Sequence, residues 1–171
     1  MALQITYWPE PVLLAGAKPV DKVDEHVREV VAGMRAVMFS LQGVGLAAPQ
    51  VGIPLRIMLV CPTGQPGDER VLLNPRITPR GDTVVGEEGC LSFPGIYGRV
   101  PRASGVHVAY EDLDGRSHVM ELDGFVARIV QHEGDHLDGK VFIDRMLPED
   151  RREVEADLEA LRARFAAGPR R

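Results

Sequence analysis

Cysteine is scarce in this chain of 171 residues, which contains only Cys61 and Cys90. The amino terminus has no charged start followed by an apolar block, so no export signal is expected. A cytoplasmic location is therefore expected, and in that compartment a structural disulfide between the two cysteines is not. Each cysteine is then either a small buried side chain or a metal-binding one.

Basic residues and long apolar runs are also in short supply. The net charge is −5, which excludes a general electrostatic attraction to DNA. No apolar run approaches the roughly 18 residues that a membrane span requires, so no membrane partner is expected. The length and the 44% hydrophobic content are typical of one globular domain. We expect a single catalytic domain over residues 1–171, with a frayed tail over about 166–171.

The apolar patterns predict helices near both ends of the chain and antiparallel strands between them. Asp24 is the expected cap of a helix to about Leu41, and a last helix is expected from Glu149 to about Phe165. A short helical turn is expected after the prolines at 9 and 11. Short apolar runs predict strands at 56–61, 71–74, 106–110 and 118–122, with a hairpin turn at 112–115. The connections are too short for parallel crossovers.

The stretch Gln131-His132-Glu133-Gly134-Asp135-His136-Leu137 predicts a metal site on a helix. Its two imidazoles, four residues apart, leave the same helix face, where they can hold one divalent ion with Glu133 as a base. Asp123 is the expected cap of this helix, and Gly139 is its expected end. These elements predict an α+β fold, with antiparallel β-sheets packed around a central metal-binding helix and with an N-terminal and a C-terminal helix.

This stretch alone does not identify the third metal ligand. A histidine ten residues after His132 would suit one group of metalloproteases, but that residue is Phe142. A later glutamate, Glu155 or Glu159, would suit a second group of zinc peptidases. An upstream cysteine, Cys90, is the remaining candidate. A solvated helix face without any metal is the plain alternative, although the apolar approach to His132 indicates a buried element.

Two further stretches differ from ordinary strands and turns. The first is Gly43-Val44-Gly45-Leu46-Ala47-Ala48-Pro49-Gln50, which is either a site segment or a glycine-rich turn with Gln50 at the surface. It lacks the lysine of a phosphate-binding loop. The second is Glu87-Glu88-Gly89-Cys90-Leu91-Ser92, where Cys90 lies beside two acids and a flexible glycine. Such a cysteine is either a small buried residue or a thiolate ligand of a metal.

Together, the three stretches at 43–50, 88–92 and 132–136 resemble the signatures of peptide deformylase, in the order of that family. The resemblance implies that Cys90, His132 and His136 bind one divalent metal. It assigns proton transfer to Glu133, and binding of the carbonyl oxygen to the Gln50 amide and the Leu91 N–H. The implied reaction removes the formyl group from the N-terminal formyl-methionine of nascent polypeptides, releasing formate. The implied native ion is Fe²⁺, with Zn²⁺, Ni²⁺ or Co²⁺ as alternatives.

Substrate contacts are expected along the extended segment of Gly43, Val44 and Gly45, by strand addition. Phe125 and Ile129, with Val44, are candidate walls of a methionine pocket, and core packing is the alternative for the first two. A pair between Arg102 and Glu88 is implied by the resemblance, and a solvated Arg102 is the alternative.

Asp135 and Ser92 are weaker candidates for residues that support the metal ligands. Gly134 stands where the family usually has a bulky residue, so looser packing behind the metal is expected. A ribosome contact through Arg162, Arg164, Arg170 and Arg171 is a further hypothesis. Besides a zinc peptidase, a non-catalytic metal-stabilised binding module is the rival function.

Overall fold

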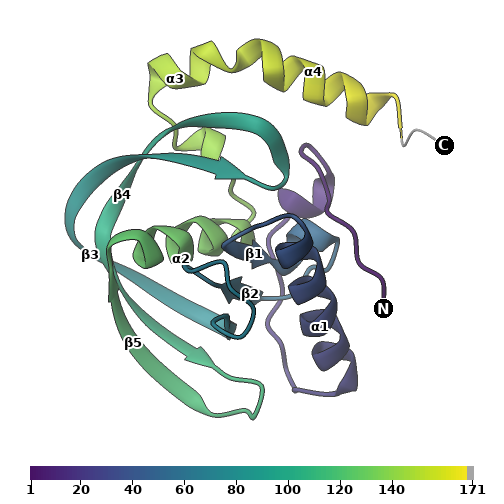
Figure 1. The fold of residues 1–171 in the computed structure, drawn as a ribbon, viewed down its shortest axis with the longest axis vertical. Coiled ribbons are helices and arrows are strands. Elements are labelled where there is room, and N and C mark those ends of the chain that lie inside the picture. The colour runs from purple at the N-terminus through teal and green to yellow at the C-terminus, as the bar shows by residue number, and fades with distance from the viewer. Residues whose placement is uncertain (169–171) are drawn as a thin grey trace.

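The computed structural model describes residues 1–168, in which the strands form one antiparallel sheet with the order β1-β2-β3-β4-β5. The strands are β1 (Gly45–Ala47), β2 (Ile57–Val60), β3 (Arg70–Cys90), β4 (Phe93–Glu111) and β5 (Ser117–Asp123). The long strands β3 and β4 curve around helix α2 (Gly124–Leu137), and β5 continues the sheet beneath it (Figure 1). The predicted α+β fold with an antiparallel sheet around the central helix is confirmed, although the strands belong to one sheet.

Strand β3 is much longer than the short strand that the apolar run at 71–74 predicts. It continues to Cys90 through a polar and mostly exposed stretch, residues 79–87, that pairs with residues 99–106 of β4. Main-chain pairing with β4, and not an alternating apolar pattern, keeps this arm in the sheet. The predicted turn at 112–115 joins β4 and β5, and its Gly115 N–H donates to the Asp112 carbonyl oxygen at 3.0 Å.

The remaining helices are α1 (Glu25–Ser40), α3 (Pro148–Glu153) and α4 (Glu155–Ala166), with 3-10 turns at Pro11–Leu13, Ala48–Val51 and Phe142–Asp144. Asp24 caps α1 as predicted, because its carboxylate accepts the Val27 N–H at 2.9 Å. The prediction of a single C-terminal helix is wrong in one respect. The helical segment is divided at Val154, whose side chain is buried in an apolar cluster with Leu158 and Leu161. Of the expected frayed tail, residues 169–171 lie outside the described residues.

Helix α2 ends as predicted but does not begin with the predicted cap. Gly139 follows the last turn with φ of +72°, a left-handed conformation that favours glycine and ends a helix. Asp123 occupies the N-cap position, but its side chain makes no capping hydrogen bond. Its carboxylate lies 2.8 Å from Arg80 Nη2 of β3 instead. An ion pair with β3, the next strand but one in the sheet, replaces the cap.

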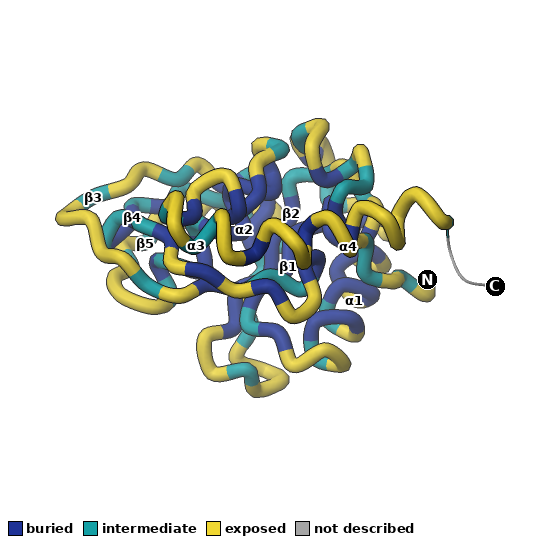
Figure 2. The backbone as a smooth tube through the Cα atoms, turned by 90° about the horizontal axis from the view of Figure 1, so that it is seen from above, coloured by how far each residue is buried: buried dark blue, intermediate teal, exposed yellow. Residues whose placement is uncertain are grey.

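Apolar side chains bury α2 against the sheet and against the elements beside it. One cluster joins Val130 and Leu137 of α2 to Val106 and Val108 of β4. Figure 2 shows α2 as a largely buried element, whereas α4 has much exposed surface. Since full burial of one such side chain contributes roughly 1.5–3 kcal/mol, packing of this kind fixes α2 in place.

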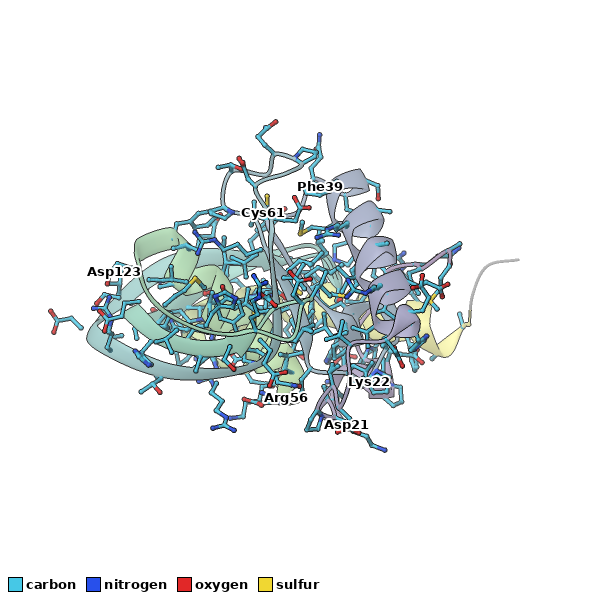
Figure 3. The ribbon with its side chains drawn as sticks, turned by 90° about the horizontal axis from the view of Figure 1, so that it is seen from below. Asp21, Lys22, Phe39, Arg56, Cys61 and Asp123 are labelled. Carbon is cyan, nitrogen blue, oxygen red and sulfur yellow. The ribbon has the colours of Figure 1, made fainter. Side chains whose placement is uncertain are left out.

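A separate cluster holds α1 against the first strands. It contains Cys61 together with the partly buried Phe39 of α1, and Figure 3 labels both residues at the same side of the molecule. Cys61 and Cys90 are both free cysteines. No helix within residues 1–168 combines the length and the apolar character that crossing a membrane requires.

The expected loosening of packing at Gly134 is not found. Gly134 is buried, and a Cβ atom added there would overlap Cδ1 of Ile77 on β3. The Ile77 side chain therefore fills the space that a larger residue at 134 would occupy. It leaves no gap at this point.

Candidate active site

Cys90, His132 and His136 lie together although the cysteine and the second histidine are 46 residues apart. One ligand atom from each residue lies within 4.8 Å of the others, and Cys90 Sγ is 3.3 Å from His136 Nε2. Sulfur and nitrogen bound to one tetrahedral zinc ion would be about 3.5 Å apart, from metal distances of about 2.3 and 2.0 Å. The donor types and their spacing fit one divalent metal ion.

The two imidazoles have different partners, and this difference sets their protonation. His132 Nδ1 lies 2.8 Å from Glu88 Oε1, which leaves Nε2 of His132 for a metal. Burial opposes charge on His132, but hydrogen bonds to Cys90 and Glu88 raise its pKa well above the usual value. Burial, with the nearby charges of His132 and Arg102, lowers the pKa of His136 well below its usual value. The low pKa keeps His136 neutral, and a metal bound at Nε2 of His132 would displace the proton that this imidazole otherwise holds.

Glu88 and Asp135 belong to a buried charge network behind the two histidines. The Arg102 guanidinium binds both Glu88 oxygens at 2.9 Å and Asp135 Oδ2 at 2.6 Å. Burial favours a neutral Glu88, but the donors from Arg102 and His132 lower its pKa below the usual range. The hypothesis that Arg102 pairs with Glu88 is confirmed. Asp135 also accepts hydrogen bonds from Arg145, at 2.6 and 2.9 Å, so it anchors α2 from outside the metal cluster.

Glu133 is buried beside the metal cluster and is held differently from Glu88. Its Oε2 atom has no hydrogen-bond partner among the described residues. Burial raises the pKa of Glu133 to about 7, with Glu88 and Asp135 adding to the increase and His132 and Arg102 opposing it. Gly45 leaves room for this side chain, since a Cβ at position 45 would lie 2.7 Å from Glu133 Oε1. A carboxyl group with this pKa exchanges protons readily near neutral pH.

Gln50 is buried, so the alternative that places it at the surface is excluded. Its Oε1 accepts the Ala47 N–H at 2.9 Å, which orients the amide within the Ala48–Val51 turn. Its Nε2 then points to Ser92 Oγ at 3.3 Å and to Cys90 Sγ at 3.5 Å. Ser92 thus orients the Gln50 amide, a contact that the sequence did not reveal.

A cavity of about 490 Å³ opens beside Cys90, His132 and Glu133. Its lining includes the sequence-predicted residues Gly43, Val44, Gly45, Gln50, Leu91, Phe125 and Ile129. Ile129 is also buried in an apolar cluster, so its predicted core packing is confirmed, whereas Phe125 is 57% exposed and is not a core residue.

The sequence interpretation missed several residues of this cavity. Tyr7, Tyr97 and Arg128 all contribute to its lining. Arg128 could have been found, because it precedes His132 by four residues on the same helix. Tyr97 is placed by strand pairing opposite Gly89, over which its ring packs. No local pattern indicates that pairing.

The zinc-peptidase alternative requires a glutamate ligand from the C-terminal segment, and the structure places neither candidate near the histidines. Glu155 and Glu159 lie on α4 and pair with Arg151 and Arg162 at the surface. Within the described part of the chain, the group of potential ligands around His132 and His136 is completed by Cys90 and not by either glutamate. Phe142, at the position of a third histidine, is buried with its ring 5.8 Å from that of His132.

Comparison with known proteins agrees with this geometry. Residues 2–152 match the family model described as polypeptide deformylase. A peptide deformylase of Rhodopirellula baltica is 42% identical over 168 residues, which cover 96% of this chain and 83% of the relative. The peptide deformylase 1B, chloroplastic/mitochondrial, of Arabidopsis thaliana is 42% identical over 166 residues, covering 95% of this chain and 61% of the relative.

Solved structures show the same fold. A peptide deformylase from Plasmodium falciparum superposes with a TM-score of 0.94 at 37% identity, covering 98% of this chain and all of the other. The plant peptide deformylase 1B superposes with a TM-score of 0.93 at 41% identity, covering 96% and 91% of the two chains. With this fold and its Cys-His-His cluster, the chain belongs to the polypeptide deformylase family of metal-dependent hydrolases, which remove the formyl group from the N-terminal formyl-methionine of newly synthesised polypeptides and release formate.

Proposed function

We propose that Cys90, His132 and His136 are the metal ligands of this deformylase and that residues 1–171 form one catalytic domain around them. The observation that carries the proposal is the 3.3 Å approach of Cys90 Sγ to His136 Nε2, with His132 in the same cluster. When bound, a divalent metal supplies a Lewis acid that lowers the pKa of water and polarises a carbonyl group. A cysteine that acts as a ligand binds as the thiolate.

Glu133 is the group that moves the proton. It accepts a proton from the attacking water and returns it to the nitrogen that leaves as the free amino terminus. The pKa of about 7 supports both transfers, because the group gives up and takes back a proton at little cost near neutral pH. Its Oε2 has no other hydrogen-bond partner in the described residues that would compete for the proton.

The carbonyl oxygen of the formyl group is bound by the Gln50 side-chain amide and the Leu91 N–H. The orientation of Gln50 Nε2 toward Cys90 Sγ supports this role, because the donor already points at the metal cluster. Donors of this kind act on the negative charge that develops on the oxygen in the transition state.

The peptide itself binds along Gly43, Val44 and Gly45, and the methionine side chain enters a pocket with Val44, Phe125 and Ile129 as its walls. All five residues line the same cavity, which also contains Cys90 and Glu133. An extended peptide can pair with the backbone of a strand edge and place alternate side chains in pockets. A methionine side chain suits the apolar walls because it is flexible and unbranched.

We propose Fe²⁺ as the native ion, with Zn²⁺, Ni²⁺ or Co²⁺ as functional substitutes. One thiolate and two imidazoles suit all four ions, so the cellular supply and the exposure to oxygen decide between them. Oxygen sensitivity is expected, because a thiolate at an iron site is prone to oxidation. Metal analysis of protein purified without oxygen should find iron as the main metal, and zinc as the main metal would contradict the assignment.

We also propose a cytoplasmic location and a transient contact with the ribosome, where the substrates emerge. The Arabidopsis relative is named as chloroplastic/mitochondrial, so fractionation of cells is the direct test of the location. Of the four arginines considered for the ribosome contact, Arg162 lies over the Trp8 ring at 4.8 Å, and Arg170 and Arg171 lie outside the described residues. Truncation after Phe165 should reduce co-sedimentation with ribosomes, and unchanged co-sedimentation would remove this part of the proposal.

The test of the main proposal compares the two cysteines. Anaerobically purified wild-type protein should release formate from a formyl-Met-Ala peptide, and Cys90→Ser should lose both the metal and this activity. Cys61→Ser is the matched control, because Cys61 lies in a different apolar cluster, and it should keep both. Retention of metal and turnover by Cys90→Ser would overturn the ligand assignment. Absence of turnover in metal-loaded wild-type protein would favour the non-catalytic binding module.

A further inference from the structure

Arg128 connects three elements of the site, and neither the sequence motifs nor the proposed chemistry gives it a role. It lies on α2, one turn before His132, and is half-buried in the wall of the cavity. Its Nη1 donates to Glu88 Oε2 at 2.7 Å and to the Val100 carbonyl oxygen at 2.9 Å. Its Nη2 donates to the Val84 carbonyl oxygen at 2.8 Å. One side chain of α2 therefore binds both long strands, β3 and β4.

The hydrogen bond from Arg128 completes the surroundings of Glu88. Oε1 accepts from His132 Nδ1 at 2.8 Å and from Arg102 at 2.9 Å, and Oε2 accepts from Arg102 at 2.9 Å and from Arg128. A carboxylate has about four lone-pair positions, so these four donors occupy all of them. Glu88 is thus held from every side, and it holds the His132 ring with its other nitrogen directed at the metal cluster.

The backbone at Gly86 makes this arrangement possible. A Cβ atom at position 86 would lie 3.1 Å from Cζ and Nη2 of Arg128, which is closer than side chains normally pack. The guanidinium therefore lies over Gly86, in the exposed part of β3 that leads to Glu88 and Cys90. Residues 81–85 of this arm are exposed, so packing against an apolar core contributes little to their position.

We propose that Arg128 is a positioning residue, which fixes the Cys90 end of β3 against α2 at the separation that the three metal ligands require. The inference rests on the proposed function, since it presupposes that Cys90, His132 and His136 bind the metal. Ligands must be held within a few tenths of an ångström, and Cys90 comes from a different element than the two histidines. Arg128 reaches both elements without entering the ligand set.

The test measures metal binding in the absence of substrate, because Arg128 also lines the substrate cavity. The variants are Arg128→Gln, Arg128→Lys and Gly86→Ala, each loaded with cobalt(II). Arg80→Gln is the matched control, since Arg80 also links β3 to the start of α2, through Asp123 at 2.8 Å, but does not contact the Glu88 network. The readouts are the rate of metal release to a chelator, the thiolate-to-cobalt absorption band, and thermal unfolding of the metal-free proteins.

Arg128→Gln should release cobalt about 10- to 100-fold faster than wild type, the usual effect of losing a group that supports metal ligands, and its absorption band should shift. The rate of cobalt release from Arg128→Lys should lie between those of wild type and Arg128→Gln, because lysine keeps one charged donor without the planar guanidinium. Gly86→Ala displaces the guanidinium by only a few tenths of an ångström, so it should accelerate release less than Arg128→Gln. Arg80→Gln should behave as wild type in release and absorption.

Two outcomes separate this inference from the proposed function. If wild-type protein shows no thiolate-to-cobalt band that Cys90→Ser removes, the proposed ligand set is wrong. If that band is present and the Arg128→Gln protein matches Arg80→Gln in release rate and absorption, the ligand set stands and Arg128 has only a structural role. Should Arg128→Gln fail to fold, the Gly86→Ala and Arg128→Lys proteins decide the question by the same two readouts.

Discussion

At the scale of single residues, two buried carboxyl groups of the same site have opposite properties. Glu88 is surrounded by donors, with Arg102 and His132 holding its pKa below the usual range against the effect of burial. Glu133 has an unpartnered oxygen within the described residues, and burial raises its pKa to about 7. Such a division between neighbouring carboxyl groups is typical of a structural anion beside an acid–base group. Glu88 orients the histidine, and Glu133 is free to exchange protons.

Glu133→Ala is expected to lower formate release by at least about 100-fold, since a positioned acid–base group contributes roughly 10²- to 10⁴-fold. The metal content should stay at the wild-type level, because Glu133 is not a member of the ligand cluster. Steady-state formate release and metal analysis on the same sample check both parts. Glu87→Ala is the control, as Glu87 lines the same cavity but is exposed, and its kcat should be unchanged. A wild-type rate in Glu133→Ala would refute the proton-transfer role.

At the scale of elements, a glycine of α2 provides space for a side chain of β3. Gly134 lies where Cδ1 of Ile77 would overlap any added Cβ atom. Glycine costs about 1 kcal/mol relative to alanine inside a helix. Here that cost accompanies a contact of the Ile77 side chain with the helix that carries the histidines.

Gly134→Met should destabilise the protein by about 1–3 kcal/mol, the usual cost of overpacking a filled site. Ile77→Ala in the same chain should relieve part of this loss, because it vacates the space that the methionine needs. Denaturant unfolding of wild type, both single variants and the double variant gives the coupling energy. Additive effects of the two substitutions would show that they do not share this space.

A second link between elements joins β4 to α3. The Asp150 carboxylate accepts the Arg99 main-chain N–H at 2.7 Å and lies 2.6 Å from Arg99 Nη2. These bonds lower the pKa of Asp150 from 3.8 to about 2. A carboxyl group whose pKa is lower in the folded state stabilises the fold fully above its unfolded pKa, and this contribution is lost as the pH falls through the folded pKa.

Asp150→Asn should lower the midpoint of thermal unfolding by roughly 2–4 °C at pH 6, the shift that one modest interaction gives in a chain of this size. The difference from wild type should shrink as the pH falls from about 4 towards 2, where wild-type Asp150 also becomes neutral. Asp157→Asn on α4 is the control for loss of a surface carboxylate. A difference that does not change between pH 6 and pH 2.5 would show that charge is not its origin.

At the scale of the whole molecule, the metal cluster joins the curved sheet to the central helix. Cys90 ends β3, whereas the two histidines lie on α2, and Figure 1 shows β3 passing around that helix. A ligand set drawn from separate elements exists only in the folded chain. A metal bound by all three side chains would therefore also increase the free energy of unfolding.

Removal of the metal should lower the unfolding midpoint by several degrees, since ligand at 100 times its Kd adds about 2.7 kcal/mol to stability. Differential scanning fluorimetry with metal, with chelator, and with chelator followed by excess metal measures the change and its reversal. In Cys90→Ser the difference between the metal-loaded and the chelated protein should largely disappear. Equal midpoints for loaded and chelated wild-type protein would contradict a shared site.

Local features of this protein were predictable from its sequence because they depend on near neighbours. The spacing of His132 and His136 follows from the helical period, the Asp24 cap from one hydrogen bond, and the end of α2 from Gly139. Local pattern gave no signal for the polar end of β3 or for Tyr97 in the cavity. Both are placed by pairing with a strand that comes later in the chain.

The sequence by itself determined which residues could bind a metal, namely two histidines one turn apart and a small set of candidates for the third ligand. Only the tertiary structure brings Cys90, and neither Glu155 nor Glu159, beside the two histidines, because this depends on how far β3 curves and on where α4 packs. It also determined the contact of Arg128 with Gly86 and the contact of Ile77 with Gly134. Helix spacing is set by hydrogen bonds within a few residues, whereas these positions result from packing between segments far apart in the chain.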